Sequence, residues 1–242
     1  MIEQARNRFP RGLAQPEGGY RFSLDSLLLA CFCQPGAKGE GADIGAGCGV
    51  VGLGLLLRHE RVRLVAVECD SASVECARAN GALLGLEDRF SVERADVAEW
   101  RPQGVLDFVV ANPPYRELGR GRASRGEERK AARFEAEGNF DAFAACAARA
   151  LKARGKFCFV HLPERLPALM AGLDRAGLEP KRMRLVHSRI HEPAKIVLME
   201  ARKQGGPGMA VEPPLALYKG TGQDTAMTEQ ALDFCPYLRC NA

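Results

Sequence analysis

Four consecutive residues, Asn112, Pro113, Pro114 and Tyr115, combine hydrogen-bond acceptors with an aromatic ring on a stiff backbone. A proline disfavours the helical conformation of the residue before it and has no N–H to donate. Two oxygens, from the Asn112 side chain and a backbone carbonyl, can accept both hydrogens of a planar amino group or amide, while the ring stacks on its plane. The same residues would also suit an ordinary turn after a strand, so the surrounding sequence decides between these readings.

The residues before this tetrapeptide predict a strand that ends at it. Residues 105–111 form an apolar run that contains a single acid, Asp107. Their length and their content of Val and Phe are typical of a strand buried on both faces of a parallel sheet. Ligands bind beyond the carboxyl ends of such strands, so we expect residues 112–115 to lie where a reaction takes place.

A glycine-rich turn follows an earlier strand that we expect to end at Ala42-Asp43-Ile44. The turn and the start of the next helix read Gly45-Ala46-Gly47-Cys48-Gly49-Val50-Val51-Gly52. Glycines let a backbone approach a ligand closely, and the N-terminus of the following helix supplies free N–H groups. The spacing of Gly47, Gly49 and Gly52 also matches the dinucleotide fingerprint, which makes a dehydrogenase an alternative. Asp43 disfavours that alternative, because a carboxylate there repels pyrophosphate and suits a cationic group.

Acidic residues end two further predicted strands. Residues 64–67 lead to Glu68, whose carboxylate can accept hydrogen bonds from both hydroxyls of a ribose. Residues 90–94 lead to Asp96, where the carboxylate and the N–H of Val97 could bind the edge of an adenine. Either acid alone is more typical of a solvated loop. Both at consecutive strand ends after a glycine turn indicate a cofactor that contains a nucleoside.

In this order, the motifs resemble those of class I S-adenosylmethionine-dependent methyltransferases, which carry Asp-x-Gly-x-Gly-x-Gly at the glycine turn. The tetrapeptide is similar to that of enzymes that methylate N6 of adenine or the amide nitrogen of glutamine. Three further segments resemble the bacterial family of adenine-N6-methyltransferases that act on a valine tRNA. They are Gly19-Tyr20-Arg21-Phe22-Ser23-Leu24-Asp25, Leu27-Leu28-Leu29-Ala30, and Pro213-Pro214-Leu215 with Tyr218.

This resemblance implies a fold, a cofactor and a reaction. The fold would be α/β and Rossmann-like, with a mostly parallel seven-stranded sheet and helices on both faces. The cofactor would be S-adenosyl-L-methionine, and the acceptor the exocyclic N6 amino group of an adenine in tRNA. Other acceptors remain open, namely N5 of a glutamine in a protein such as a release factor, or an adenine in rRNA or DNA. A non-catalytic RNA-binding module is a further alternative.

The resemblance also assigns roles to individual residues. The catalytic residues would be Asn112, Pro113, Pro114 and Tyr115. The cofactor would be bound by Asp43, Gly45, Ala46, Gly47, Gly49, Glu68, Asp96, Val97 and Asn112. Substrate contacts are expected near the N-terminus, through Arg21 and Asp25. The arginine-rich composition of the loop after Tyr115, rather than the resemblance, adds Arg116, Arg120, Arg122 and Arg125.

The charge distribution agrees with an RNA substrate. The chain carries a net charge of +4. Residues 116–133 hold seven basic and three acidic side chains, so the net charge of this segment alone equals that of the whole chain. Guanidinium groups beside the predicted site would contact phosphates, and RNA loops with unstacked bases are frequent targets of sequence-specific proteins. A solvated loop of mixed charge is the alternative for this segment.

With 242 residues, the chain is long enough for one large α/β domain. We expect an N-terminal arm and helix in residues 1–38, the methyltransferase domain in 39–203, and a tail in 204–242 that packs on it. Helices are expected at 141–151 and 166–175, and later strands at 156–161, 181–187 and 195–201. With no secretory signal or membrane-spanning run, we expect a cytoplasmic protein, with a monomer favoured. The nine scattered cysteines lack a Cys-x-x-Cys pair, so no metal site is predicted.

Overall fold

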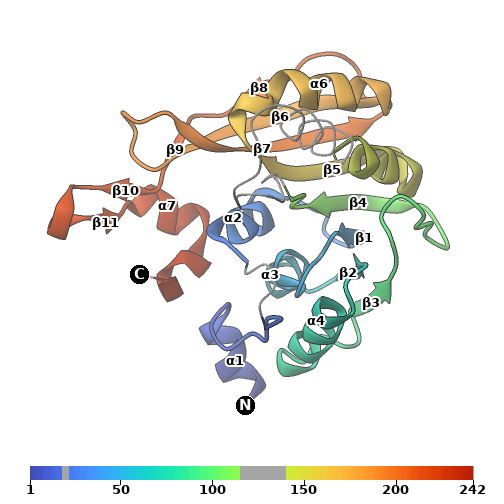
Figure 1. The fold of residues 1–242 in the computed structure, drawn as a ribbon, viewed down its shortest axis with the longest axis horizontal. Helices are drawn as coiled ribbons and strands as arrows, with labels where there is room; N and C mark the ends of the chain where they lie inside the picture. Colours follow the sequence, from blue (N-terminus) through green and yellow to red (C-terminus); the bar gives the residue numbers. More distant parts are fainter. Residues whose placement is uncertain (18–21, 115–139, 242) are drawn as a thin grey trace, which may run out of the picture.

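The computed structural model describes residues 1–17, 22–114 and 140–241, which are built around one large sheet (Figure 1). The sheet has nine strands in the order β3-β2-β1-β4-β5-β7-β6-β8, and β9 also pairs with β6. The long strands are β1 (Gly39–Ile44), β2 (Val62–Glu68), β3 (Phe90–Arg94), β4 (Leu106–Ala111), β5 (Leu151–His161), β6 (Leu178–His187) and β7 (Ala194–Lys203).

Most neighbouring strands are parallel, which confirms the predicted class of fold. Strands β3, β2, β1, β4 and β5 run in one direction, and β7 runs antiparallel to both β5 and β6. The count exceeds the expected seven because two strands of two residues each, β8 (Ala210–Val211) and β9 (Leu215–Ala216), pair with β6. The parallel arrangement brings the carboxyl ends of β1, β2, β3 and β4 to one edge of the sheet.

Helices cover both faces of the sheet, as the alternation of side chains along β4 shows. Phe108 and Val110 belong to one buried cluster, and Val109 and Ala111 belong to the other. The first cluster packs against α2 (Leu24–Phe32) and α3 (Val50–Arg58), and the second against a helix that includes residues 140–150 and against α6 (Leu166–Arg175). The other α-helices of the described residues are α1 (Ile2–Arg8), α4 (Ser71–Leu83) and α7 (Glu229–Phe234).

The segments expected to flank the domain pack on it. Phe9 near the N-terminus and Cys235 and Leu238 in the tail are buried in the same cluster as α2 and α3. The tail continues from β10 (Tyr218–Lys219) and β11 (Ala226–Met227) into α7 (Figure 1). Within the described part of the chain, no helix is long and apolar enough to cross a bilayer.

The start of β5 departs from the prediction. We expected the preceding helix to reach Leu151 and the strand to begin at Lys156, but β5 begins at Leu151. Leu151 pairs with Leu106, and the pairing resumes only at Lys156 opposite Phe108, so the intervening residues bulge out of register. The buried Leu151 side chain stabilises this early pairing, because it belongs to the core on one face of the sheet.

Candidate active site

A cavity of about 600 Å³ lies at the carboxyl edge of the sheet, a volume ordinary for a small-molecule site. Residues that follow β1, β2, β3 and β4 line it, together with parts of the N-terminal segment and of the helix after residue 139. The lining residues are Pro16, Glu17, Gly45, Gly47, Glu68, Cys69, Asp70, Ala72, Ser73, Asp96, Val97, Asn112, Pro113, Pro114, Ala142 and Phe143. The structure therefore brings together most of the predicted site residues that it describes.

Asn112, directly after β4, has one amide atom paired and one unpaired. Its Nδ2 donates to Oγ of Ser26 in α2 at 3.0 Å. Its Oδ1 is buried and has no hydrogen-bond partner in the described part of the chain. Leaving a buried carbonyl oxygen unpaired costs about 1–3 kcal/mol. The site thus holds an acceptor that a ligand with an N–H group would satisfy.

The three glycines of the turn are required for different reasons, although all have a positive φ. A Cβ at Gly45 would lie 2.8 Å from the ring of Phe143, and one at Gly49 would lie 2.9 Å from the ring of Phe90. A Cβ at Gly47 would meet no atom within 4 Å. Gly45 and Gly49 therefore permit close packing, whereas Gly47 leaves open space beside the cavity that it lines.

Glu68 connects the glycine turn to the turn after β2. Its Oε2 accepts from the N–H of Gly47 at 2.8 Å, and its Oε1 accepts from the N–H groups of Cys69 and Asp70 at 2.8 and 2.9 Å. Asp70 in turn caps α4 by accepting from the N–H of Ser73, which lowers the pKa of Asp70. Sγ of Cys69 also donates to Oε1, at 3.4 Å, so Oε1 has three donors and Oε2 one, which leaves Oε2 with an acceptor position for a ligand.

Comparison with known proteins identifies the family. The model of the methyltransferase small domain family matches residues 24–167. The chain belongs to this family. That match covers α2, the glycine turn and the tetrapeptide, and it includes every lining residue of the cavity except Pro16 and Glu17.

Two relatives carry the name tRNA1(Val) (adenine(37)-N6)-methyltransferase. The protein of Phocaeicola vulgatus is 29% identical over 179 residues, 74% of this chain and 75% of its own. The protein of Cronobacter sakazakii is 37% identical over 148 residues, 60% of this chain and 59% of its own length. A crystal structure from Agrobacterium tumefaciens, described as a predicted O-methyltransferase, superposes with a TM-score of 0.70. At 21% identity, covering 88% of this chain and 96% of that one, it shows the shared fold.

Three residues predicted to bind the methyltransferase's cofactor do not line the cavity. Asp43 is buried beneath the turn, with 1% of its surface exposed, and its Oδ2 accepts from the N–H of Gly52 at 2.9 Å. Burial raises the pKa of Asp43 to about 7. Its carboxyl therefore holds the start of α3 rather than facing a cation. Ala46 and Gly49 also lie outside the lining, Gly49 because it is the N-cap of α3 and packs on Phe90.

The cavity of this methyltransferase has an acidic lining. Four carboxyl groups line it, and none of the lining residues in the described part of the chain is Lys or Arg; the acids are Glu17, Glu68, Asp70 and Asp96. Clustered carboxylates attract cations and repel phosphate groups. This favours a ligand with positive charge, such as a sulfonium amino acid, over a pyrophosphate-bearing dinucleotide. We expected Asp43 to favour a cationic ligand, but in the structure the acids that line the cavity are in a position to do so.

Several predicted residues lie outside the described part of this methyltransferase, namely Tyr115, Arg21, Arg116, Arg120, Arg122 and Arg125. Asp25 lies in the first turn of α2 and does not line the cavity. Conversely, the sequence did not predict Ser26, Glu17 or Phe143 as site residues. No pattern in the sequence links Ser26 to Asn112, and Phe143 stands in an alanine-rich helix that resembles ordinary core.

Proposed function

We propose that this methyltransferase transfers the methyl group of S-adenosyl-L-methionine to the exocyclic N6 amino group of an adenine in tRNA. The observation that carries the proposal is the unpaired Oδ1 of Asn112 at a cavity with an acidic lining. The names of the relatives from Phocaeicola vulgatus and Cronobacter sakazakii support the choice of tRNA as the acceptor.

The residues of the cavity fit this cofactor. The acidic lining suits its net positive charge, to which the sulfonium and the ammonium contribute, and the open space beside Gly47 leaves room for it. Asp96 and the N–H of Val97 would bind the adenine, and Glu68 would bind a ribose hydroxyl with its remaining acceptor position. When bound, S-adenosylmethionine supplies a methyl carbon that is electrophilic because it is attached to a sulfonium.

Asn112 and Pro113 would position the nucleophile. The amine is a poor nucleophile because its lone pair is delocalised into the base. If Asn112 Oδ1 and the carbonyl of Pro113 accept its two hydrogens, the lone pair becomes available and points in a fixed direction. Because Nδ2 donates to Ser26, the amide oxygen is the atom of Asn112 left without a partner in the described part of the chain. We propose that Tyr115 stacks on the base, which is worth ~1–3 kcal/mol.

The reaction would need no strong general base. None of the lining residues in the described ranges is a histidine or a lysine. His161, at the end of β5, is buried, and its Nδ1 accepts from the N–H of Leu162 at 2.8 Å. Burial lowers the pKa of His161 to about 4. After methyl transfer the amine carries a positive charge and is acidic enough to release its proton to water.

Mass spectrometry of nucleosides tests the acceptor. Unmodified tRNA, rRNA, duplex DNA and release factor are each incubated with the full-length protein and labelled cofactor. We expect labelled N6-methyladenosine from tRNA. Labelled N5-methylglutamine, with unlabelled tRNA, would instead assign the protein to the glutamine class. Asn112→Ala should lower kcat on tRNA by about 100-fold or more, because one group that stabilises the transition state is lost.

The arginine-rich segment is tested by salt dependence. We propose that Arg120, Arg122 and Arg125 contact tRNA phosphates, since each neutralised phosphate releases counterions. Replacing all three by Gln should weaken tRNA binding and reduce the slope of log Kd against log salt by about 2 to 3. Binding that is equally strong at low and moderate salt would refute this docking role.

A further inference from the structure

The N-terminal segment is attached to α4 at two points. Residues 9–17, here called the arm, follow α1 and reach the cavity, which Pro16 and Glu17 line. Arg6 in α1 donates to the carbonyls of Leu84 and Gly85, at the end of α4, at 2.8 and 3.0 Å. The first of these bonds is partly buried and the second is exposed.

The second attachment is buried and is made by one side chain, Asn80. Only 1% of the surface of Asn80 is exposed. Its Oδ1 accepts from the N–H of Ala14 at 2.7 Å, and its Nδ2 donates to the carbonyl of Ala14 at 3.0 Å. The amide therefore pairs with both polar backbone groups of one arm residue, as a neighbouring strand would.

The same amide also holds the glycine turn. Nδ2 of Asn80 donates to the carbonyl of Cys48 at 2.9 Å, so both of its hydrogens are used. Cys48 stands between Gly47, which lines the cavity, and Gly49. Ala14 is two residues before Pro16, which lines the cavity from the arm. One buried side chain on α4 thus fixes the arm and the glycine turn relative to each other.

We propose that Asn80 is a positioning residue for cofactor binding, which holds the arm as one wall of the cavity and thereby places the Glu17 carboxyl in its lining. The inference rests on the proposed cofactor but not on the proposed acceptor. Glu17 adds a negative charge to the cavity, which favours a cationic ligand. The arm would lose its fixed position if Asn80 could not bind Ala14.

The chemistry of the amide makes Asn80→Asp a sharp test. An aspartate has the same shape and can still accept from the N–H of Ala14. Its second oxygen would face the carbonyls of Ala14 and Cys48 in a buried site, where it has no hydrogen to donate. Ala14→Pro is the complementary change, because it removes the N–H on the arm and leaves the bond between Asn80 and Cys48 intact.

Binding of S-adenosylmethionine to the full-length protein without an acceptor, measured by titration calorimetry, provides the readout. We expect Asn80→Asp and Ala14→Pro each to raise Kd about tenfold, which corresponds to about 1.4 kcal/mol. Hydrogen exchange at the amides of Leu13, Gln15 and Glu17 should become faster in both variants. Asn7→Asp, an exposed asparagine in α1, is the control and should bind as the wild type does.

Outcomes of this experiment separate the two proposals. A wild-type Kd in a folded Asn80→Asp or Ala14→Pro variant would overturn the role of Asn80, and so would a lower kcat at saturating cofactor with unchanged Kd. If Asn80→Asp fails to fold, Ala14→Pro decides. If Kd rises as expected but no RNA is methylated, the role of Asn80 stands and the proposed acceptor fails.

Discussion

At the scale of single residues, the site depends on which way an amide points. An asparagine side chain offers an acceptor on one side and two donors on the other, so its use in catalysis requires something to fix the orientation. For Asn112 this is the hydroxyl of Ser26, which accepts from Nδ2 and leaves Oδ1 as the unpaired acceptor. Ser26 therefore matters because its contact with Nδ2 of Asn112 leaves Oδ1 of the same amide without a partner.

Removing the hydroxyl of Ser26 should impair turnover. We predict that Ser26→Ala lowers kcat on tRNA about tenfold, because the Asn112 amide loses the partner that fixes it. Ser26→Thr keeps the hydroxyl and should retain most of the activity. In an Asn112→Ala background, Ser26→Ala should have little further effect, since the two residues act as a unit. Additive losses in this double-mutant cycle would show that Ser26 acts by another route.

Asp43 predicts a pH dependence of stability. Burial raises the pKa of Asp43 from 3.8 to about 7, so between these values the folded protein holds a proton that the unfolded chain has released. The free energy of unfolding therefore falls as the pH rises through this window. Asp43→Asn does not titrate and can still accept from the N–H of Gly52.

The difference in the free energy of unfolding between Asp43→Asn and the wild type isolates the contribution of Asp43, because the contributions of the other titrating groups are the same in both proteins. In urea unfolding from pH 4 to pH 8, Asp43→Asn should become progressively more stable than the wild type. The change should be at most roughly 4 kcal/mol, from about three pH units. A difference that does not vary with pH would mean that Asp43 is ionised in the folded protein throughout.

At the scale of elements, substitutions in the glycine turn should affect mainly cofactor binding at one position and mainly stability at another. Gly47→Ala would place a methyl group in open space beside the cavity, so it should raise the Kd for the cofactor and cost only the ~1 kcal/mol of a left-handed alanine. Gly49 is the N-cap of α3, and the new methyl group of Gly49→Ala would collide with the ring of Phe90. We therefore expect the free energy of unfolding to fall by about 2 kcal/mol or more. Calorimetric titration and urea unfolding distinguish the two. Equal effects of both changes on Kd would contradict the assignment.

Elements were predictable where chemical signals in the sequence mark their ends. Strand β3 and helix α6 have the predicted bounds, because Asp96 follows the former and Gly177 the latter. The start of β5 was missed because the pairing of Leu151 with Leu106 is a tertiary contact.

Site residues were predictable where they directly follow a strand. Asn112, Glu68 and Asp96 were found because strand ends carry ligands, so their local sequence indicates their place. Ser26 and Asn80 lie within helices, where a polar residue usually faces solvent. Their partners are 86 and 66 positions away, so only the folded structure reveals them.

At the scale of the whole molecule, one core joins segments from both ends of the chain. The tail contacts α2 and α3: Sγ of Cys235 lies 3.4 Å from the carbonyl of Leu27, and the hydroxyl of Tyr237 donates to Gly54 at 2.7 Å. The ring of Phe9 from the arm packs on that of Tyr237. Because α2 also carries Ser26, the tail supports an element that orients the catalytic amide.

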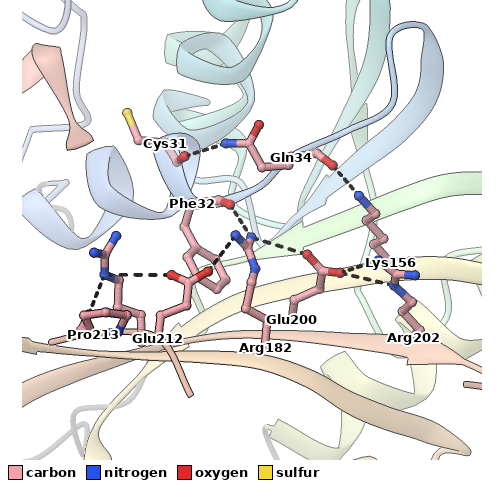
Figure 2. A network of polar contacts seen from close by, with 10 residues as sticks. Cys31, Phe32, Gln34, Lys156, Arg182, Glu200, Arg202, Glu212 and Pro213 are labelled. Atoms are coloured by element: carbon pink, nitrogen blue, oxygen red, sulfur yellow. Dashed lines mark hydrogen bonds and ion pairs between the residues drawn. The ribbon is translucent and has the colours of Figure 1, made fainter. Parts of the chain in front are cut away.

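A polar network strengthens the same connection from the sheet (Figure 2). Arg182 in β6 donates to the carbonyl of Phe32 at the end of α2, at 2.6 Å, and its guanidinium lies 4.0 Å from the centre of the Phe32 ring. It also pairs with Glu200 in β7 and with Glu212 in the tail, at 3.3 and 3.1 Å. Arg202 pairs with Glu200 from the other side. The network therefore joins α2, two strands and the tail.

Removing Glu200 should destabilise the whole molecule. The Glu200 side chain is 5% exposed, and its loss would leave the guanidinium of Arg182, 24% exposed, with less compensation for its burial. Breaking a buried pair typically costs about 3 kcal/mol or more, so we expect such a loss for Glu200→Ala. Glu75→Ala is the matched control, because Glu75 pairs with Arg78 at the surface and is 74% exposed. Its cost should stay below about 0.5 kcal/mol.

Two probes can follow this unfolding, one local to a single face of the sheet and one that reports on the secondary structure of the whole molecule. Trp100 is the only tryptophan and lies in the core cluster on the face away from α2. If the tail, α2 and the sheet form one cooperative unit, Trp100 fluorescence and far-UV circular dichroism should give the same urea midpoint in the wild type. In Glu200→Ala both midpoints should fall together. A shift in dichroism without a shift in fluorescence would show that the network stabilises only the tail and α2, leaving the second core independent.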